Sequence, residues 1–513
     1  MKGDSVSSSP STAQARPARA GAPAPERRKL GVLAVAFLIV AASAPLTVIA
    51  GGVTSTFSVT HVAGVPLGFL ILAAALAIFA IGYAAMSRFI NNAGAFYAYV
   101  AQGIGRPTGV GASLVALVAY NMMQLGIWGM FGFQVSMLIG EKTGLDIPWW
   151  VGVLVGIVIV GIMGVNRVDL SAKVLGVLVA LEFLVVIVFD VVAFTNPAAG
   201  FSTEPMSPAA LFVPGVGAVF AFGIAAFMGF EQAAIYGEES KDPRRTIPRA
   251  TFLAVAVIGV FYALSAWALA LGIGVDKITD PGGISGEEAG PPLFFGFVAE
   301  NLGVIWVDIM SVLFITSIFA ALVSFHNAVA RYFFSLAREG VLPAKLAAVR
   351  QTTGAPWVGS LAQSVIAVVV VIAFAIGEAG WNPESGPYPV ITLFTWLTNT
   401  GALGLVLLMA VVSLAVVGFF RKDARGVGVG SRLVAPIVSA VALAAILLLI
   451  LSNFDVLLGQ PESNATTFLL PAIAILPGVI GIVWAYVIKR RRPEVYARIG
   501  HGADAGDAQL GDA

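Results

Sequence analysis

Cysteine is absent from the chain, and its absence excludes disulfide bonds and thiolate metal sites. Charged residues are scarce as well, at 11% of the sequence. The histidines His61, His326 and His501 are spread too widely along the chain to indicate a metal site. No nucleotide-binding or nucleophile motif stands in a suitable context. We therefore expect a protein that is not an enzyme, holds no cofactor or metal, and does not bind nucleic acid.

Hydrophobic residues, by contrast, make up 58% of the chain, which is more than a soluble protein can bury. A membrane-spanning helix needs roughly 20 predominantly apolar residues. Twelve apolar segments approach or exceed this length, near 31–57, 65–87, 113–139, 148–165, 172–195, 212–235, 250–273, 303–336, 357–377, 389–419, 432–453 and 467–488. The sequence therefore predicts an all-α polytopic membrane protein with twelve transmembrane helices.

The distribution of Lys and Arg along the chain predicts the orientation of these helices. If the N-terminus is cytoplasmic, every basic residue except Lys142 and Lys277 lies on the inner side of the membrane. An excess of Lys and Arg is typical of cytoplasmic loops. We therefore expect an integral protein of the cytoplasmic (plasma) membrane with both termini in the cytoplasm. Residues 1–29, rich in Ser, Ala and Pro, are expected to form a disordered tail, and residues 489–513 a second tail.

Two of the predicted helices, five segments apart, carry features that interrupt a helix. The first contains Pro45, which lacks a backbone N–H, and the pair Gly51-Gly52. The sixth contains Gly229 directly before the acidic part of its sequence, where Glu231 follows an apolar run. Interrupted segments at matching places in two halves are typical of inverted repeats with a binding site at the membrane midplane. Gly and Pro also occur in ordinary membrane helices, so a simple kink is the alternative.

Residues 229–250, GFEQAAIYGEESKDPRRTIPRA, resemble the sixth-helix and following-loop signature of the amino acid–polyamine–organocation (APC) superfamily. Three further stretches are similar to segments of that superfamily in the same order, namely AGAFYAYVAQGIG at 93–105, SAKVLGVLVALEFL at 171–184 and SFHNAVARYFFSLAREGVLP at 324–343. The resemblance covers roughly 30–490 and implies the LeuT-type fold and secondary active transport. Residues 30–488 would then form the transporter domain, with inverted repeats at about 30–195 and 212–419 and extra helices at 432–488.

The resemblance implies that the first break binds the substrate. In the superfamily, a Gly-Ser/Ala-Gly stretch unwinds here and its amides hold a substrate carboxylate; the matching residues are Ser43, Ala44 and Pro45, followed by Leu46 and Thr47. Helix N-termini are natural anion sites, but Pro45 supplies no N–H. This departure favours a diamine, which needs acceptors such as freed carbonyls and the Thr47 hydroxyl. A proline kink without a binding role is the alternative.

The sixth segment and the third supply further candidate binding residues. Glu231 follows Gly229 and could bind a substrate ammonium or exchange a proton, because an acid inside a membrane helix is costly and usually functional. The flanking Phe227 and Phe230 could pack on an ammonium group or simply fill space, and Phe227 is the better candidate gate. On the third segment, Tyr120 and Gln124 share one helix face.

For the coupling ion, the candidates are Glu182, Glu231, Ser317 and Ser324. Many proton-coupled relatives carry a lysine at about the position of Glu182, so this chain reverses the sign of the charge. A buried carboxylate there could bind a cation or hold the coupling proton, or it could be a protonated structural acid. The serines could contribute oxygens to an ion site or bond to their own backbone.

Together these features predict a secondary active transporter that imports amino acids or related amines by alternating access, coupled to protons, with sodium as the alternative coupling ion. A putrescine-like polyamine importer and an amino acid/amine exchanger remain alternatives. A channel or a nutrient sensor on a transporter fold is less consistent with the paired breaks and short polar tails. The lipid bilayer and a small-molecule substrate are the expected partners, and the chain is expected to be a monomer or a homodimer.

Overall fold

The computed structural model describes residues 31–90, 96–166, 172–231, 240, 242–284, 286–459 and 463–500. The predicted tail 1–29, the Ala93-Gly94 pair and most of the charged loop after Glu231 lie outside these ranges. Within them all regular structure is helical, as the sequence predicts.

Within the described ranges, ten helices are long and apolar enough to cross a membrane. They are α4 (Val65–Ser87), α6 (Arg106–Thr143), α7 (Trp149–Asn166), α8 (Ala172–Thr195), α11 (Pro243–Ile273), α14 (Val304–Arg338), α15 (Trp357–Gly377), α16 (Thr395–Lys422), α17 (Ala435–Ser452) and α19 (Ala465–Arg491). Each corresponds to one of the predicted segments. Many of their large apolar side chains are exposed, for example Ile162 at 58% and Val369 at 62%. Outward apolar faces of this kind suit contact with lipid rather than water.

The first predicted segment is broken where its sequence contains proline. The helix α1 (Val32–Ala42) stops before Ala44, which adopts a left-handed backbone with φ 49°. That conformation costs a non-glycine residue about 1–2 kcal/mol. The chain resumes as the short helix α2 (Pro45–Thr47), a π-helical turn (Val48–Val53) and α3 (Thr54–Thr60). Because Pro45 has no N–H and a ring that clashes with the preceding turn, a helix can begin there but cannot continue through it.

The sixth predicted segment is broken as well. The helix α10 (Val216–Phe227) has 12 residues. A helix of that length spans about 18 Å, well short of the ~30 Å hydrocarbon core. Met228 is extended, and Gly229 has φ 114°, a conformation that favours glycine. The chain thus changes direction directly before Glu231.

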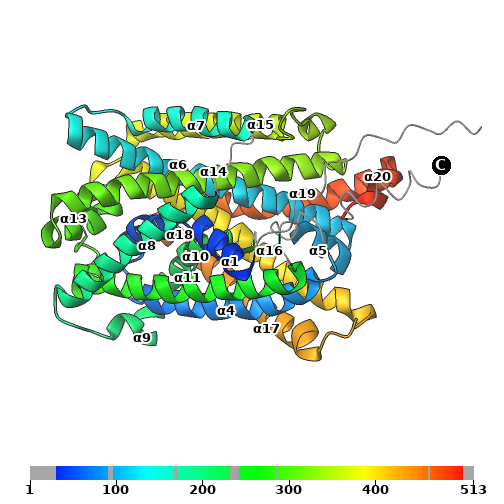
Figure 1. Ribbon diagram of the computed structural model, residues 1–513, viewed down its shortest axis with the longest axis horizontal. Helices are drawn as coiled ribbons and strands as arrows, with labels where there is room; N and C mark the ends of the chain where they lie inside the picture. The colour runs from blue at the N-terminus through cyan, green and yellow to red at the C-terminus, as the bar shows by residue number, and fades with distance from the viewer. Residues whose placement is uncertain are drawn as a thin grey trace, which may run out of the picture.

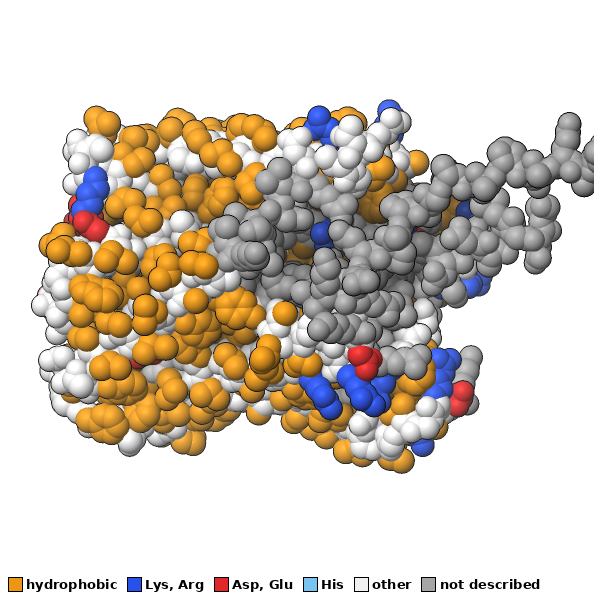
Figure 2. Space-filling model, viewed as in Figure 1, with side chains coloured by type: hydrophobic (Ala, Val, Ile, Leu, Met, Phe, Trp, Pro, Cys, Tyr) orange, Lys and Arg blue, Asp and Glu red, His pale blue; other side chains and the backbone are white. Residues whose placement is uncertain are grey.

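The helices run between two ends of the molecule that differ in charge. In Figure 1, α7 and α15 lie along one long edge and α4 and α11 along the other, with α1 and α10 between them. The helix α5 (Phe96–Gly103) and the helix α20 (Pro493–Arg498) lie at one end, and the helix α13 (Pro291–Asn301) at the other. Most Lys and Arg side chains visible in Figure 2 lie towards the end that carries α20. We call it the basic end; it includes Arg106, which lies over the Tyr496 ring of α20, and Arg492, which directly precedes α20.

Lys142 and Lys277, the two exceptions to the predicted charge distribution, lie beside acidic residues. Lys142 ends α6 and pairs with Asp308 near the start of α14 and with Glu141. The amine of Lys277 is 2.7 Å from Glu288. The chain therefore places these two lysines in ion pairs away from the basic end.

Candidate functional site

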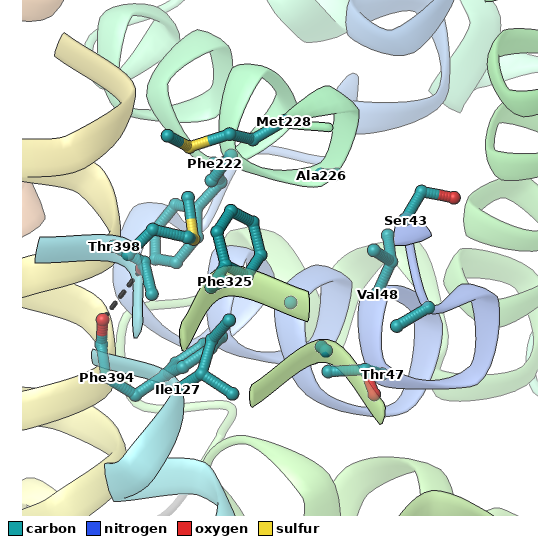
Figure 3. A pocket seen from close by; sticks show the side chains of 15 residues that line it. Ser43, Thr47, Val48, Ile127, Phe222, Ala226, Met228, Phe325, Phe394 and Thr398 are labelled. Atoms are coloured by element: carbon teal, nitrogen blue, oxygen red, sulfur yellow. Dashed lines mark hydrogen bonds between the residues drawn. The ribbon is translucent and has the colours of Figure 1, made fainter. Parts of the chain in front are cut away.

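A small cavity of about 60 Å³ lies between the two interrupted segments (Figure 3). One wall comes from the break of the first segment and the turn after it, with Ser43, Ala44, Thr47, Val48 and Gly52. Another wall comes from the end of α10, with Phe222, Ala225, Ala226 and Met228. The tertiary structure thus brings both breaks to one cavity, although more than 170 residues separate them in the sequence.

Three further helices complete the cavity. Met123 and Ile127 come from α6, Ala321 and Phe325 from α14, Thr398 from α16, and Phe394 from the π-helical turn directly before α16. Among the described residues that line the cavity, none has a charged side chain, and the polar side chains are the hydroxyls of Ser43, Thr47 and Thr398. The Ser43 hydroxyl donates to the carbonyl of Val40 at 2.7 Å, and the Thr398 hydroxyl donates to the carbonyl of Phe394 at 2.7 Å (dashed in Figure 3).

Glu182 lies behind the first break rather than in the cavity wall. It is on α8, 2% exposed, and its Oε2 accepts hydrogen bonds from the Ser317 hydroxyl at 2.8 Å and from the Leu46 N–H at 3.3 Å. The Thr47 hydroxyl, which borders the cavity, donates to Ser317 at 2.9 Å. A chain of hydrogen bonds therefore runs from the cavity through Thr47 and Ser317 to the carboxyl group of Glu182. It joins the first break to α14 and α8.

Glu231 is also buried, at 1% exposure, and it too lies outside the cavity wall. The Tyr120 hydroxyl of α6 donates to its Oε1, and the N–H of Gly229 donates to its Oε2 at 3.0 Å. The positive φ of Gly229 turns that amide back towards the carboxyl group. The Tyr120 ring stacks on Tyr332 of α14, with centroids 5.3 Å apart. Glu231 thus links the sixth-segment break to α6.

Gln124, one turn beyond Tyr120, points into a separate buried polar cluster. Its side-chain amide lies 3.3 Å from Nδ1 of His326, and its Oε1 accepts from Gln363 of α15. The other ring nitrogen of His326 lies 2.7 Å from the Ser360 hydroxyl. Sequence reasoning did not single out Ser360 and Gln363, although two polar residues three apart in an apolar segment give the same signal as Tyr120 and Gln124.

The remaining sequence candidates lie around the site but not on the cavity wall. Phe227 is fully buried, and its ring lies 6.3 Å from Phe69 and 6.5 Å from Tyr262. Phe230 is buried against Phe79, with centroids 6.1 Å apart. Ser324 is half-buried on α14, two turns beyond Ser317.

Most of the apolar lining residues were not identified from sequence. Phe222, Met228, Met123, Ile127 and Phe325 lie in segments whose residues are mostly apolar. An apolar residue in such a helix carries no signal of which neighbour it faces, so only the packing of the helices reveals it.

Comparison with known proteins identifies the class. A family model described as amino acid permease matches residues 35–497. The lysine-specific permease LysP of Lactococcus lactis is 27% identical over 298 residues, which cover 54% of this chain and 54% of LysP. The low-affinity putrescine importer PlaP of Escherichia coli is 24% identical over 328 residues, 62% of this chain and 68% of PlaP. The L-asparagine permease of Salmonella typhimurium is 24% identical over 438 residues, 79% of this chain and 78% of that permease.

The ten apolar helices and this match define an integral membrane protein of the transport class. The chain belongs to the amino acid permease family, within the APC superfamily. Family membership confirms the predicted resemblance and the expectation that the protein is not an enzyme. The match to LysP spans only about half of that relative's length, and the three relatives differ in the substrates that they are named for.

Proposed function

We propose that the protein is a secondary active transporter that imports an amino acid or related amine across the cytoplasmic membrane by alternating access. The observation that carries the proposal is the cavity enclosed by both interrupted segments. A site bounded by helix breaks can change its contacts on either side without repacking whole helices, which alternating access requires.

The two interrupted segments complete the membrane topology of this proposal. Counted with the ten long helices, they give twelve spans, in a LeuT-type arrangement with repeats at about 30–195 and 212–419 and extra helices at 432–488. Both termini would be cytoplasmic, because the basic end carries α20 and the helix ends that the positive-inside rule assigns to the cytoplasm.

Both ends of an amino acid backbone find complementary partners at this cavity. The helical run that starts at Pro45 presents its positive end beside Ala44, and α10 presents its negative end beside Met228. In this proposal these helix ends would favour a carboxylate at the first break and an ammonium at the second, with the carboxylate held by groups other than Pro45, which has no N–H, and the Leu46 N–H, which donates to Glu182. Ser43, Ala44, Thr47 and Met228 would make these contacts, with Pro45 and Leu46 shaping the break.

Glu182 would couple transport to a proton. It is buried, and the Thr47–Ser317 hydrogen bonds connect it to the cavity, so a change in its protonation alters the contacts of the first break. Glu231 and Tyr120 would act on the other break, by holding it to α6 in one state and releasing it in the other.

A polyamine importer is the second candidate. Pro45 removes one amide donor from the first break, and the relative PlaP is a putrescine importer by name. A diamine would need two acceptor groups instead of a carboxylate clamp.

Uptake by purified protein in proteoliposomes tests the proposal. We expect at least one labelled amino acid or amine to accumulate when an inward proton gradient is imposed, and to accumulate much less without it. Accumulation that depends on a sodium gradient would mean that sodium, and not the proton, is the coupling ion. Loss of internal amine upon uptake would indicate exchange. A folded protein that moves no amino acid or amine, or that conducts ions passively, would exclude the transporter function in favour of a sensor or a channel.

A further inference from the structure

We infer that the substrate is an amino acid with an uncharged, apolar side chain, and that Gly52 sets the size of side chain that fits. This inference rests on the proposed transport function. It names the substrate class for the same cavity.

The walls of the cavity exclude a substrate with a charged side chain or a second ammonium group. Its sides are formed by Met123, Ile127, Phe222, Phe325 and Met228, and none of the described residues that line it is charged. A charged group in such surroundings is stable only when it is paired and hydrogen-bonded. The side-chain ammonium of lysine, or the second ammonium of a diamine, would meet none of these partners.

The two buried acids do not supply a negatively charged partner for a substrate side chain. Neither Glu182 nor Glu231 borders the cavity. The Oε2 of Glu182 accepts from Ser317 and Leu46, and the two carboxyl oxygens of Glu231 accept from Tyr120 and Gly229. Because these contacts hold the acids to the backbone and to neighbouring helices, neither is positioned to pair with a substrate side chain.

The polar groups that do border the cavity suffice only for the backbone of an amino acid. They are the hydroxyls of Ser43, Thr47 and Thr398 and the peptide groups beside the two breaks. Ser43 and Thr47 belong to the first break itself. The apolar remainder of the cavity is then the space for the side chain.

Gly52 is the wall residue with open space in front of it. It lies in the π-helical turn Val48–Val53, and a Cβ added there would meet no atom within 4 Å. At the neighbouring Gly51, which does not line the cavity, an added Cβ would lie 2.9 Å from Cε of Met130 and 3.2 Å from the Phe314 ring. Gly51 is therefore needed for packing, whereas the missing side chain of Gly52 leaves volume for a substrate.

A panel of labelled substrates tests the class. The full chain in proteoliposomes would be given alanine, valine, leucine, phenylalanine, asparagine, lysine and putrescine at equal concentration. We expect the apolar amino acids to accumulate and lysine, putrescine and asparagine to accumulate at least about tenfold less. Preferential uptake of lysine, putrescine or asparagine would overturn the inference but leave the transporter function standing. Absence of uptake for every compound, with folded protein, would overturn the function itself.

Substitution of Gly52 tests whether this residue sets the size of the substrate side chain that fits. The change Gly52→Val adds three carbon atoms to the wall and should lower uptake of leucine and phenylalanine by at least roughly 10- to 200-fold relative to alanine, because a single methylene is worth that much in an apolar pocket. Gly52→Ala should give a smaller shift in the same direction. Gly296→Ala is the matched control: Gly296 lies on α13, does not line the cavity, and has open space for a Cβ.

Thermal stabilisation of each variant by added alanine or leucine, measured in detergent, separates binding from transport. The inference predicts that Gly52→Val keeps the stabilisation by alanine and loses that by leucine. An equal loss for all amino acids, or no change in the ratio of leucine to alanine uptake, would overturn the role of Gly52.

Discussion

At the scale of single residues, the chain buries two carboxyl groups beside its helix breaks, Glu182 on α8 and Glu231 shortly after α10. Glu182 contacts Ser317 and the amide of Leu46, and Glu231 contacts Tyr120 and the amide of Gly229. Each acid therefore binds a backbone N–H close to a helix break and a side chain from a neighbouring long helix. Acids in membrane helices are rare and usually tied to function, and here each is tied to one of the two breaks.

The change Glu182→Gln is expected to make uptake insensitive to the proton gradient. Glutamine can still accept from Ser317 and Leu46 through its carbonyl oxygen, so the first break should keep its shape, but no proton can be exchanged. Initial uptake rates in proteoliposomes, measured across a range of pH, provide the test. Asp190→Asn is the matched control, because Asp190 lies on the same helix and accepts from Ser265 at 2.7 Å without lining the cavity. A Glu182→Gln protein with the parental pH profile would make this acid structural.

The change Glu231→Gln should abolish net uptake without unfolding the protein. One hydrogen bond to a charged group contributes about 1.5–3 kcal/mol, so the milder Tyr120→Phe should slow uptake by at least roughly tenfold. Phenylalanine retains the ring that stacks on Tyr332. Uptake rates combined with size-exclusion profiles check both variants. Normal uptake by Glu231→Gln would remove this residue from the mechanism.

At the scale of helices, the position of the short α10 depends on its contacts with α17 and with Asn453, the residue that follows α17. The N–H of Gly215 donates to Oδ1 of Asn453 at 2.9 Å, which fixes the beginning of α10. Gly217, the second residue of α10, lies so close to α17 that an added Cβ would be 1.9 Å from the carbonyl oxygen of Leu449. Small residues permit such close approach of helices in membranes. A helix too short to span is thus positioned by a glycine contact rather than by its length.

The change Gly217→Ala is expected to destabilise the protein by about 1–3 kcal/mol, because it forces α10 away from α17. Thermal unfolding in detergent would measure the loss. Gly296→Ala should leave the midpoint unchanged or raise it slightly, since its Cβ meets no atom and alanine favours the helix. Equal midpoints for the two variants would contradict the packing argument.

At the scale of the whole molecule, charge separates the two ends. The basic end is also where the C-terminal segment docks: the N–H of Gly500 donates to the Tyr97 hydroxyl at 2.7 Å, and Arg106 lies over the Tyr496 ring. At the opposite end, Lys142 and Lys277 pair with acids. Exposed pairs of this kind contribute about 0–1 kcal/mol each, so their main consequence is to reduce the positive charge at that end.

The absence of cysteine makes the orientation directly measurable. Single changes Glu287→Cys and Thr352→Cys place one thiol at an exposed position on each side of the proposed membrane. A membrane-impermeant maleimide should label Glu287→Cys in intact cells and Thr352→Cys only after the membrane is opened. The unmodified chain, which has no thiol, is the control for background labelling. The reverse pattern would place the basic end outside the cell.

The sequence by itself determined the long helices of this protein and the location of both breaks. Apolar runs, Pro45, and Gly229 before Glu231 act locally, through backbone hydrogen bonding and the cost of charge in lipid, so no partner is needed to recognise them. Only the tertiary structure decided that Thr47, Met228, Phe325 and Gly52 share one cavity while Glu231 and Gln124 point elsewhere. A helix that is apolar on all sides does not encode which face meets lipid, a neighbour or a cavity, so that choice rests on how the helices pack.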